Sequence, residues 1–126
     1  MILRTLVVVV ALFAVCGAHA QGWKPDKPIR LIVPFVPGGA ADVVSRLVAE
    51  RLAAALGQQV IVDNRAGAAG VLGLEMLAKA PPDGYTLGEA GDTATVLPLM
   101  FRRPPWDPRR DFAPVGMMTV QPLVLA

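Results

Sequence analysis

Apolar and polar positions alternate along the chain in two different periods. Residues 28–35 (PIRLIVPF) form a β-branched run bounded by prolines, which predicts a buried strand. Residues 41–56 place apolar side chains at three- and four-residue spacing, which predicts an amphipathic helix, and Gly57 stands where a helix commonly ends. The apolar face of this predicted helix consists of Val44, Leu47, Val48, Leu52, Ala55 and Leu56.

The same alternation continues to the end of the sequence. The further expected elements are a strand at 59–63, a helix at 69–80, a strand at 85–88, a shorter helix at 92–100 and extended segments at 113–119 and 122–126. We expect Pro98 to cut the shorter helix, and Trp106 to pack on the surface of the sheet. Strands that alternate with helices predict an α/β fold, in which a parallel sheet carries flanking helices joined by right-handed crossovers.

The first twenty residues have the pattern of a cleaved secretory signal peptide. Arg4 supplies positive charge, residues 6–15 are apolar, and Ala18-His19-Ala20 is an A-x-A cleavage site. The apolar run is shorter than the roughly 20 residues that a membrane-spanning helix needs. We therefore expect residues 1–20 to direct residues 21–126 to the periplasm. An uncleaved anchor and a lipid on Cys16 are the alternatives, and Val15 before that cysteine argues against the lipid.

Composition excludes several classes of function for the mature chain. The sequence has 12 Lys and Arg against 10 Asp and Glu, and cleavage would remove one of these basic residues. Such a balance, without a clustered basic face, argues against nucleic acid as a partner. Cleavage would also remove the single cysteine and the single histidine, Cys16 and His19. Without thiol or imidazole, Ser/His/Asp and Cys/His catalysis are excluded, and we expect no metal and no cofactor.

The turns that follow the predicted strands are the candidates for ligand binding. Ligands of open parallel sheets bind outside the carboxyl ends of the strands, and here these turns are residues 34–42, 64–70 and 89–93. The first contains Gly38 and Gly39, where a ligand can approach the backbone, and leads into a helix whose free N–H groups favour a carboxylate. A tight turn without a ligand is the alternative for each glycine pair. No dinucleotide or P-loop fingerprint is present.

The motifs at these turns resemble those of the Bug-type extracytoplasmic solute receptors, which are the substrate-binding proteins of tripartite tricarboxylate transporters. The resemblance extends from Pro25 to Val115. It rests on Pro34-Phe35 with Gly38-Gly39 and Asp42, on Asn64-Arg65 with Gly67 and Gly70, and on residues 82–87 (PDGYTL). The resemblance implies a two-lobed, type II periplasmic-binding fold, of which residues 21–126 would be a truncated first lobe. It also implies a small carboxylate as ligand and membrane transporter subunits as partners, with a complete receptor that is a monomer.

The resemblance also implies which residues bind the ligand. The predicted ligand-binding residues are Phe35, Val36, Gly38, Gly39, Asp42, Gly91, Asp92 and Thr93. For Asp42 two interpretations stay open, a direct contact to the ligand or a helix-start carboxylate that accepts backbone N–H groups. The third turn departs from the family pattern, because Glu89 and Asp92 would repel an anion unless one is protonated, pairs with a cation or points away.

Three classes of function are compatible with these residues. We favour a transport receptor, not an enzyme, and expect residues 21–126 alone to bind weakly or not at all, because half a cleft does not surround a ligand. A ligand-sensing module for a membrane signalling partner would use the same fold and is the alternative. An enzyme with Asp42, Glu89 and Asp92 as acid and base is the third class, which needs a geometry that a sequence does not supply.

Overall fold

The computed structural model describes residues 23–103 and 105–120. The predicted signal peptide (1–20) and the predicted extended segment 122–126 lie outside the described residues. The elements, in chain order, are β1 (Ile29–Val33), α2 (Ala40–Leu56), β2 (Val60–Asn64), the 3₁₀ turn η2 (Ala68–Gly70), α3 (Val71–Ala78), β3 (Thr86–Gly88) and α4 (Thr93–Met100). No helix among the described residues is long and apolar enough to cross a membrane.

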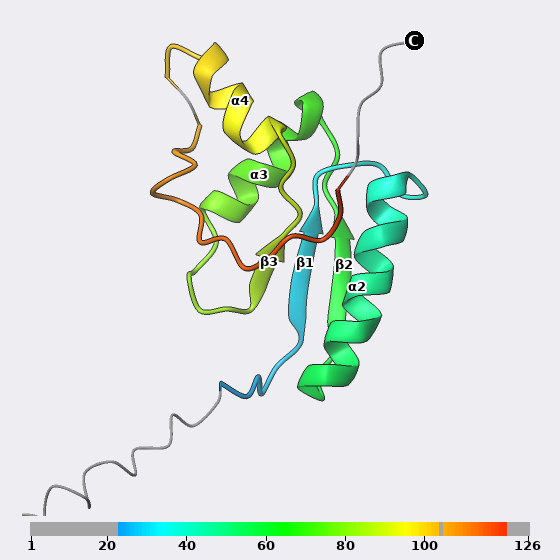
Figure 1. Cartoon of the computed structure of the whole chain (residues 1–126). Helices are drawn as coiled ribbons and strands as arrows, with labels where there is room; N and C mark the ends of the chain where they lie inside the picture. The colour runs from blue at the N-terminus through cyan, green and yellow to red at the C-terminus, as the bar shows by residue number, and fades with distance from the viewer. Residues whose placement is uncertain (1–22, 104, 121–126) are drawn as a thin grey trace, which may run out of the picture.

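The strands form a parallel sheet with helices on both sides, which confirms the predicted fold class. The sheet has three strands in the order β2-β1-β3, and β1 pairs in parallel with both neighbours. Leu31 and Val33 pack against Ala49 of α2 on one face. The next strand position points to the opposite face, and there Leu77 of α3 lies against Gly88 of β3. Figure 1 shows α2 on one side of the sheet and α3 with α4 on the other.

Helix α2 has the predicted length but turns a different face to the sheet. Its buried residues are Asp42, Ser45 and Ala49, whereas Leu47, which was predicted on the buried face, is 60% exposed. Two of the three buried side chains are polar, and each has a hydrogen-bond partner at the end of a strand. Because those bonds compensate for the loss of water, the face that meets the sheet does not follow the apolar pattern alone. Gly57 ends the helix as predicted, in a left-handed conformation with φ 65°.

Helix α3 is shorter than predicted, because the chain makes a tight left-handed turn before it. The predicted range was 69–80, but Ala69 has φ 55° and Gly70 has φ 91°, and neither value fits a right-handed helix. This turn allows Gly70 and Gly73 to pack closely against the loop that follows β1. A Cβ atom on Gly73 would lie 2.9 Å from Cα of Pro34, and one on Gly70 would lie 3.4 Å from Cβ of Pro34.

Helix α4 continues through Pro98, so the prediction that this proline cuts the helix is wrong. A proline lacks the N–H group that would bond to the carbonyl four residues earlier, here the carbonyl of Ala94. That carbonyl instead accepts a hydrogen bond of 2.8 Å from Nε1 of Trp106. Trp106 is only 2% exposed and packs with Leu74 and Ala94 in a cluster of the two helices. Its predicted place on the surface of the sheet is therefore also wrong.

Residues 113–119 do not form a fourth strand of the sheet. No strand is present between residues 105 and 120, and the side chains of Val115 and Met117 are 87% and 81% exposed. An extended segment becomes a strand only when a neighbour pairs with its backbone, and no described strand does so. The last strand of the predicted order is absent from the part of the chain that the structure describes.

Candidate functional site

The carboxyl ends of the strands meet at one edge of the sheet. Since all three strands run in parallel, the turns after Val33, Asn64 and Gly88 leave the sheet on the same side (Figure 1). Backbone hydrogen bonds hold the turns together, from the amide of Arg65 to the carbonyl of Val33 at 2.7 Å and from the amide of Glu89 to the carbonyl of Ile32 at 2.9 Å. This edge is where ligands bind in open parallel sheets.

The first turn, residues 34–39, presents an open helix end at this edge. Gly38 has φ 82°, a conformation that side chains rarely adopt, and it turns the chain into α2. Gly39 is the N-cap of α2 and offers no side chain to the first amides of the helix. The first N–H groups of a helix have no partner within it and attract an anion. The first amides of α2 therefore lie at the edge of the sheet without a side-chain cap from residue 39.

Asp42, which lies in the first helical turn of α2, links the loop of residues 34–39 to the end of β2. Its Oδ2 accepts hydrogen bonds from the amide of Gly38 at 2.9 Å and from Nε of Arg46 at 3.0 Å, and its Oδ1 accepts one from Nδ2 of Asn64 at 2.9 Å. Asn64 also donates to the carbonyl of Phe35 at 3.2 Å. Both oxygens of this carboxylate have donors within the chain, and the side chain of Asp42 is only 5% exposed. Of the two interpretations of Asp42, the bond from the amide of Gly38 agrees with a helix-start carboxylate that accepts a backbone N–H group, and a direct contact to the ligand stays a prediction.

The hydrogen bonds to Asp42 also change its acidity. The guanidinium of Arg46, then the amide of Gly38 and the side chain of Asn64, lower the pKa of Asp42 to about 2 from its ordinary 3.8. A carboxyl whose pKa is lower in the folded state stabilises the fold above its unfolded pKa, and that stabilisation is lost as the pH falls through the folded value.

Replacing Asp42 with asparagine is expected to lower the melting temperature at pH 7 and to weaken the acid dependence of stability. The variant has no carboxyl at this position. The difference in melting temperature between the variant and the unchanged protein should therefore narrow as the pH falls from about 4 to about 2. Thermal unfolding at several pH values measures the effect. A Glu50→Gln variant on the exposed side of the same helix is the control, and an Asp42→Asn difference independent of pH would contradict the expectation.

The third turn carries the remaining predicted residues. The side chain of Asp92 caps α4 by accepting a hydrogen bond of 2.8 Å from the amide of Thr93. The Thr93 hydroxyl oxygen is buried and has no hydrogen-bond partner within the described residues. Glu89 is partly buried and its Oε2 accepts a hydrogen bond of 3.0 Å from the hydroxyl of Ser45 in α2. The carboxylate of Glu89 thus points toward α2, while that of Asp92 belongs to its own helix.

The predicted ligand-binding residues of the first turn differ in their solvent exposure and in the free space around them. Val36 is 63% exposed, and a Cβ atom at Gly38 would have no neighbour within 4 Å. Phe35 is partly buried and packs against the core cluster beneath α2, and its carbonyl accepts the hydrogen bond from Asn64. A Cβ atom at Gly91 in the third turn would also meet nothing within 4 Å. The structure brings these residues to one edge; their contact with a ligand stays a prediction.

Two residues that organise this edge were not among the predicted site residues. Asn64 bonds to Asp42 and to the first loop, and Ser45, which is fully buried, bonds to Glu89. The positions 42, 45 and 49 share one face of a helix. Asp42 and Ser45 are two polar residues on this buried face. They are the sequence signal that would have indicated these contacts, because buried polar residues need partners on the adjacent strands.

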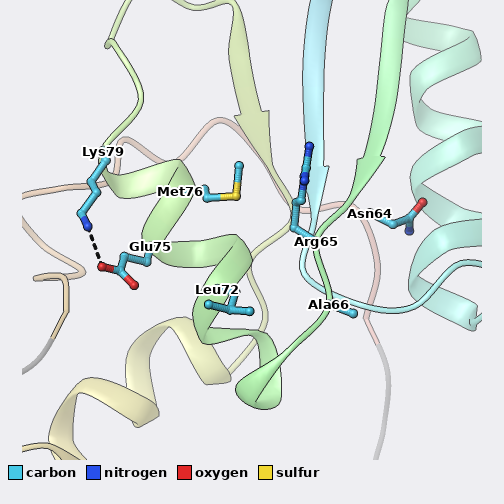
Figure 2. A pocket seen from close by; sticks show the side chains of 7 residues that line it. All are labelled: Asn64, Arg65, Ala66, Leu72, Glu75, Met76 and Lys79. Carbon is cyan, nitrogen blue, oxygen red and sulfur yellow. Dashed lines mark hydrogen bonds and ion pairs between the residues drawn. The ribbon is translucent and has the colours of Figure 1, made fainter.

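A separate hollow of about 480 Å³ lies beside α3 and contains none of the predicted ligand-binding residues. Figure 2 shows its lining, which consists of Asn64, Arg65, Ala66, Leu72, Glu75, Met76 and Lys79. Lys79 and Glu75 are paired with each other at 2.6 Å, and Arg65 is paired with Asp63 at 2.9 Å. With its charges already paired, this hollow is a weaker candidate for an anion than the strand ends.

The described residues contain no group of three His, Cys, Asp or Glu side chains that could hold a metal ion. Each acidic side chain at this edge also bonds to a different partner. Asp42 is bonded to Arg46 and Asn64, Asp92 caps α4, and Glu89 is bonded to Ser45. What the edge offers is amide donors, small residues and two carboxylates, Glu89 and Asp92, that have no cation partner among the described residues.

The sequence of this chain matches a known protein family. Residues 44–126 match the family described as tripartite tricarboxylate transporter family receptor. The chain belongs to this family. A curated relative from Bordetella bronchiseptica, a UPF0065 protein, is 47% identical over 98% of this chain and 37% of its own length. The chain thus spans about 37% of the length of that relative.

Solved structures, one of them a periplasmic binding protein, share the fold. The periplasmic binding protein BugD is 36% identical, with a TM-score of 0.69 over 73% of this chain and 31% of its own chain. MatC from Rhodopseudomonas palustris, solved with bound malate, is 34% identical, with a TM-score of 0.63 over 75% of this chain and 32% of its own. The part of this chain that matches corresponds to about a third of each of these two chains.

Proposed function

We propose that this chain forms one wall of a periplasmic receptor that captures small carboxylates for a tripartite transporter. The observation that supports it most is the first turn, which ends β1 and exposes the uncapped amino end of the 17-residue helix α2 at the strand ends. The amides and the dipole of such a helix favour a carboxylate without any basic side chain. Membership of the receptor family and the malate bound to MatC support the same ligand class.

The cellular place and the domain organisation belong to the same proposal. The A-x-A pattern of residues 1–20 supports export to the periplasm, and the similarity to BugD, a periplasmic binding protein, agrees with it. Residues 21–126 supply the first lobe of a two-lobed cleft, and a second lobe closes on the ligand from the opposite side. The protein binds its ligand and releases it unchanged to membrane subunits of the transporter.

The test is ligand binding by the product of the complete gene. Titration calorimetry with a panel of carboxylates of three to six carbons, each compared with its neutral amide, measures whether a carboxylate is required. We expect saturable binding of at least one acid, at least tenfold weaker binding of its amide, and recovery of the acid unchanged. Binding of no acid in the panel, or equal binding of acid and amide, would contradict the proposal.

A further inference from the structure

The outer face of α4 is apolar although it points to solvent. Ala94 and Pro98 are the buried residues of this helix. On the opposite side, Leu99 is 84% exposed and Met100 is 75% exposed, and Val96 is exposed with them. These three side chains follow one another at three- and four-residue spacing, so they share one face. A helix that borders water ordinarily carries polar side chains there, and the last turn of α4 does not.

The apolar face of α4 ends in basic side chains. Phe101, which follows the helix directly, is exposed, as are Arg102 and Arg103 after it. Arg102, Arg103 and Arg109 have no acidic partner within 4.0 Å among the described residues. Residues 93–106 of the sequence contain no Asp or Glu, so the charges beside the apolar face have one sign. We call the following residues the α4 tip: Val96, Leu99, Met100, Phe101, Arg102 and Arg103.

The fold presents the α4 tip outward. Nε1 of Trp106 donates to the carbonyl of Ala94 at 2.8 Å, and Trp106 packs with Leu74 of α3. The chain is thus fixed to the helices on both sides of the tip, while the tip itself adds nothing to that buried cluster. Figure 1 shows the last turn of α4 at the outer edge of the structure, away from the sheet.

Exposed apolar side chains on α2 have different neighbours. Val43 and Leu47 are both exposed and lie four residues apart on that helix. The residues three or four positions from them include Arg46, Glu50 and Arg51, which carry both signs of charge. Such a mixed surface is ordinary for a helix in water. The α4 tip differs because its apolar face is bordered by arginine alone.

An apolar face bordered by arginines matches the surface of a bilayer that contains anionic lipid. Apolar side chains of a surface-bound helix lie roughly 5–10 Å deep, at the boundary between headgroups and acyl chains. Arginine keeps its guanidinium among the lipid phosphates while its stem lies along the apolar side chains. A free anion would pair with the arginines but would leave Leu99 and Met100 in water. With eight residues, α4 lies on such a surface and does not cross it.

We infer that the α4 tip attaches this protein to the surface of a membrane that contains anionic lipid. Leu99, Met100 and Phe101 enter the headgroup region, and Arg102 and Arg103 pair with lipid phosphates. So small a group gives a weak and reversible attachment, which salt weakens further. The tip lies at the far end of α4 from the strand ends, so this attachment is independent of the proposed carboxylate site.

Co-sedimentation with lipid vesicles tests this inference. The sample is the complete gene product without residues 1–20, because that apolar segment would itself bind lipid. We expect binding to phosphatidylcholine vesicles to become at least about tenfold tighter when phosphatidylglycerol is included, and to weaken as salt is added. Leu99→Ser with Met100→Ser should weaken binding to the mixed vesicles at least about tenfold. The matched pair on α2, Val43→Ser with Leu47→Ser, should change it less than about twofold.

The charge is tested at one position in the α4 tip and one outside it. Arg103→Gln should weaken binding to the mixed vesicles roughly fivefold, the effect of one basic side chain near an anionic surface. Arg51→Gln on α2 should change it less than about twofold. All four residues replaced on α4 or α2 for their exposure in this series should leave the melting temperature without vesicles unchanged, and Arg103→Gln shows the same if the arginine does not serve to stabilise the end of α4.

Three results would overturn the inference. One is equal binding to vesicles with and without phosphatidylglycerol, or binding to neither. Another is binding that Leu99→Ser with Met100→Ser or Arg103→Gln leaves unchanged. The third is a dimer, seen by size-exclusion chromatography, that Leu99→Ser with Met100→Ser dissociates, because a second copy would then cover the tip. Weaker vesicle binding by variants that melt at the temperature of the unchanged protein supports attachment through the tip.

Discussion

Replacing Trp106 with alanine is expected to lower the free energy of unfolding by about 3–5 kcal/mol, the range for a large aromatic removed from a core. The side chain is 2% exposed and fills the space between α3 and α4, against Leu74 and Ala94. Replacing it with phenylalanine should cost less, about 1–3 kcal/mol, because most of the volume stays but the carbonyl of Ala94 loses its donor. Urea denaturation of the complete protein measures both changes.

A double-mutant cycle isolates the hydrogen bond from the packing. Pro98→Ala restores the N–H group that can bond to the carbonyl of Ala94, so Trp106→Phe should cost less in that background, by about 1 kcal/mol. The control is Trp23→Phe, since Trp23 is 50% exposed and contacts Tyr85 at the surface. Strictly additive effects of the substitutions at 98 and 106 would show that the indole N–H does not compensate for the proline.

The three strands of the sheet and the bounds of α2 could be predicted because local pattern and tertiary structure agree there. The β-branched run of β1 is buried from Ile29 to Val33 except at Arg30, and Gly57 has the left-handed conformation that ends α2. Parallel order followed from the alternation of strands and helices, since a parallel connection needs a crossover. The common edge of the strand-end turns is a direct consequence of that order.

The other elements depend on contacts that lie far apart in the sequence. Pro98 stays inside α4 because Trp106, eight positions later, supplies a donor to Ala94. Helix α3 begins late because Gly70 and Gly73 must approach Pro34, a residue of the first turn. Periodicity within a short window contains neither fact, so the bounds of α3, the break at Pro98 and the place of the tryptophan were predicted wrongly.

The candidate site was predictable in place but not in the roles of its side chains. The open glycines of the first turn could be named from the sequence, and they lie at the strand ends. The partners of Asp42 could not be named, because Asn64 comes 22 positions later and reaches it only through the pairing of β1 with β2. In the same way, the bond from Ser45 to Glu89 depends on how α2 lies across the sheet.

Replacing Gly39 with aspartate is expected to leave the fold as stable or stabilise it slightly, while affinity for a carboxylate falls at least about tenfold, or 1.4 kcal/mol. Gly39 has φ −77° and ψ 171°, the extended conformation of an ordinary N-cap residue, and an added Cβ would have its nearest neighbour, the carbonyl of Val36, at 3.6 Å. An aspartate there caps α2, which is worth a few tenths of a kcal/mol relative to glycine. Its carboxylate then occupies the amides proposed for the ligand.

Gly39→Asn is the matched control, because asparagine has nearly the same size and caps a helix about as well but carries no charge. Titration of both variants with the acid that the unchanged protein binds separates the effect of charge from that of volume. We expect the aspartate variant to bind more weakly than the asparagine variant, and both to melt at or above the temperature of the unchanged protein. Equal affinity of the two would show that the amino end of α2 does not hold the ligand carboxylate.

This comparison bears on why a glycine stands at the start of α2. The conformation of Gly38, with φ 82°, favours glycine by itself, but that of Gly39 fits any residue. Serine, aspartate or asparagine would stabilise the helix more than glycine does. A residue that gives up this stability and leaves the first amides uncovered is what a site for an external carboxylate needs. A variant that gains stability as it loses its ligand would show that the open helix end serves binding rather than folding.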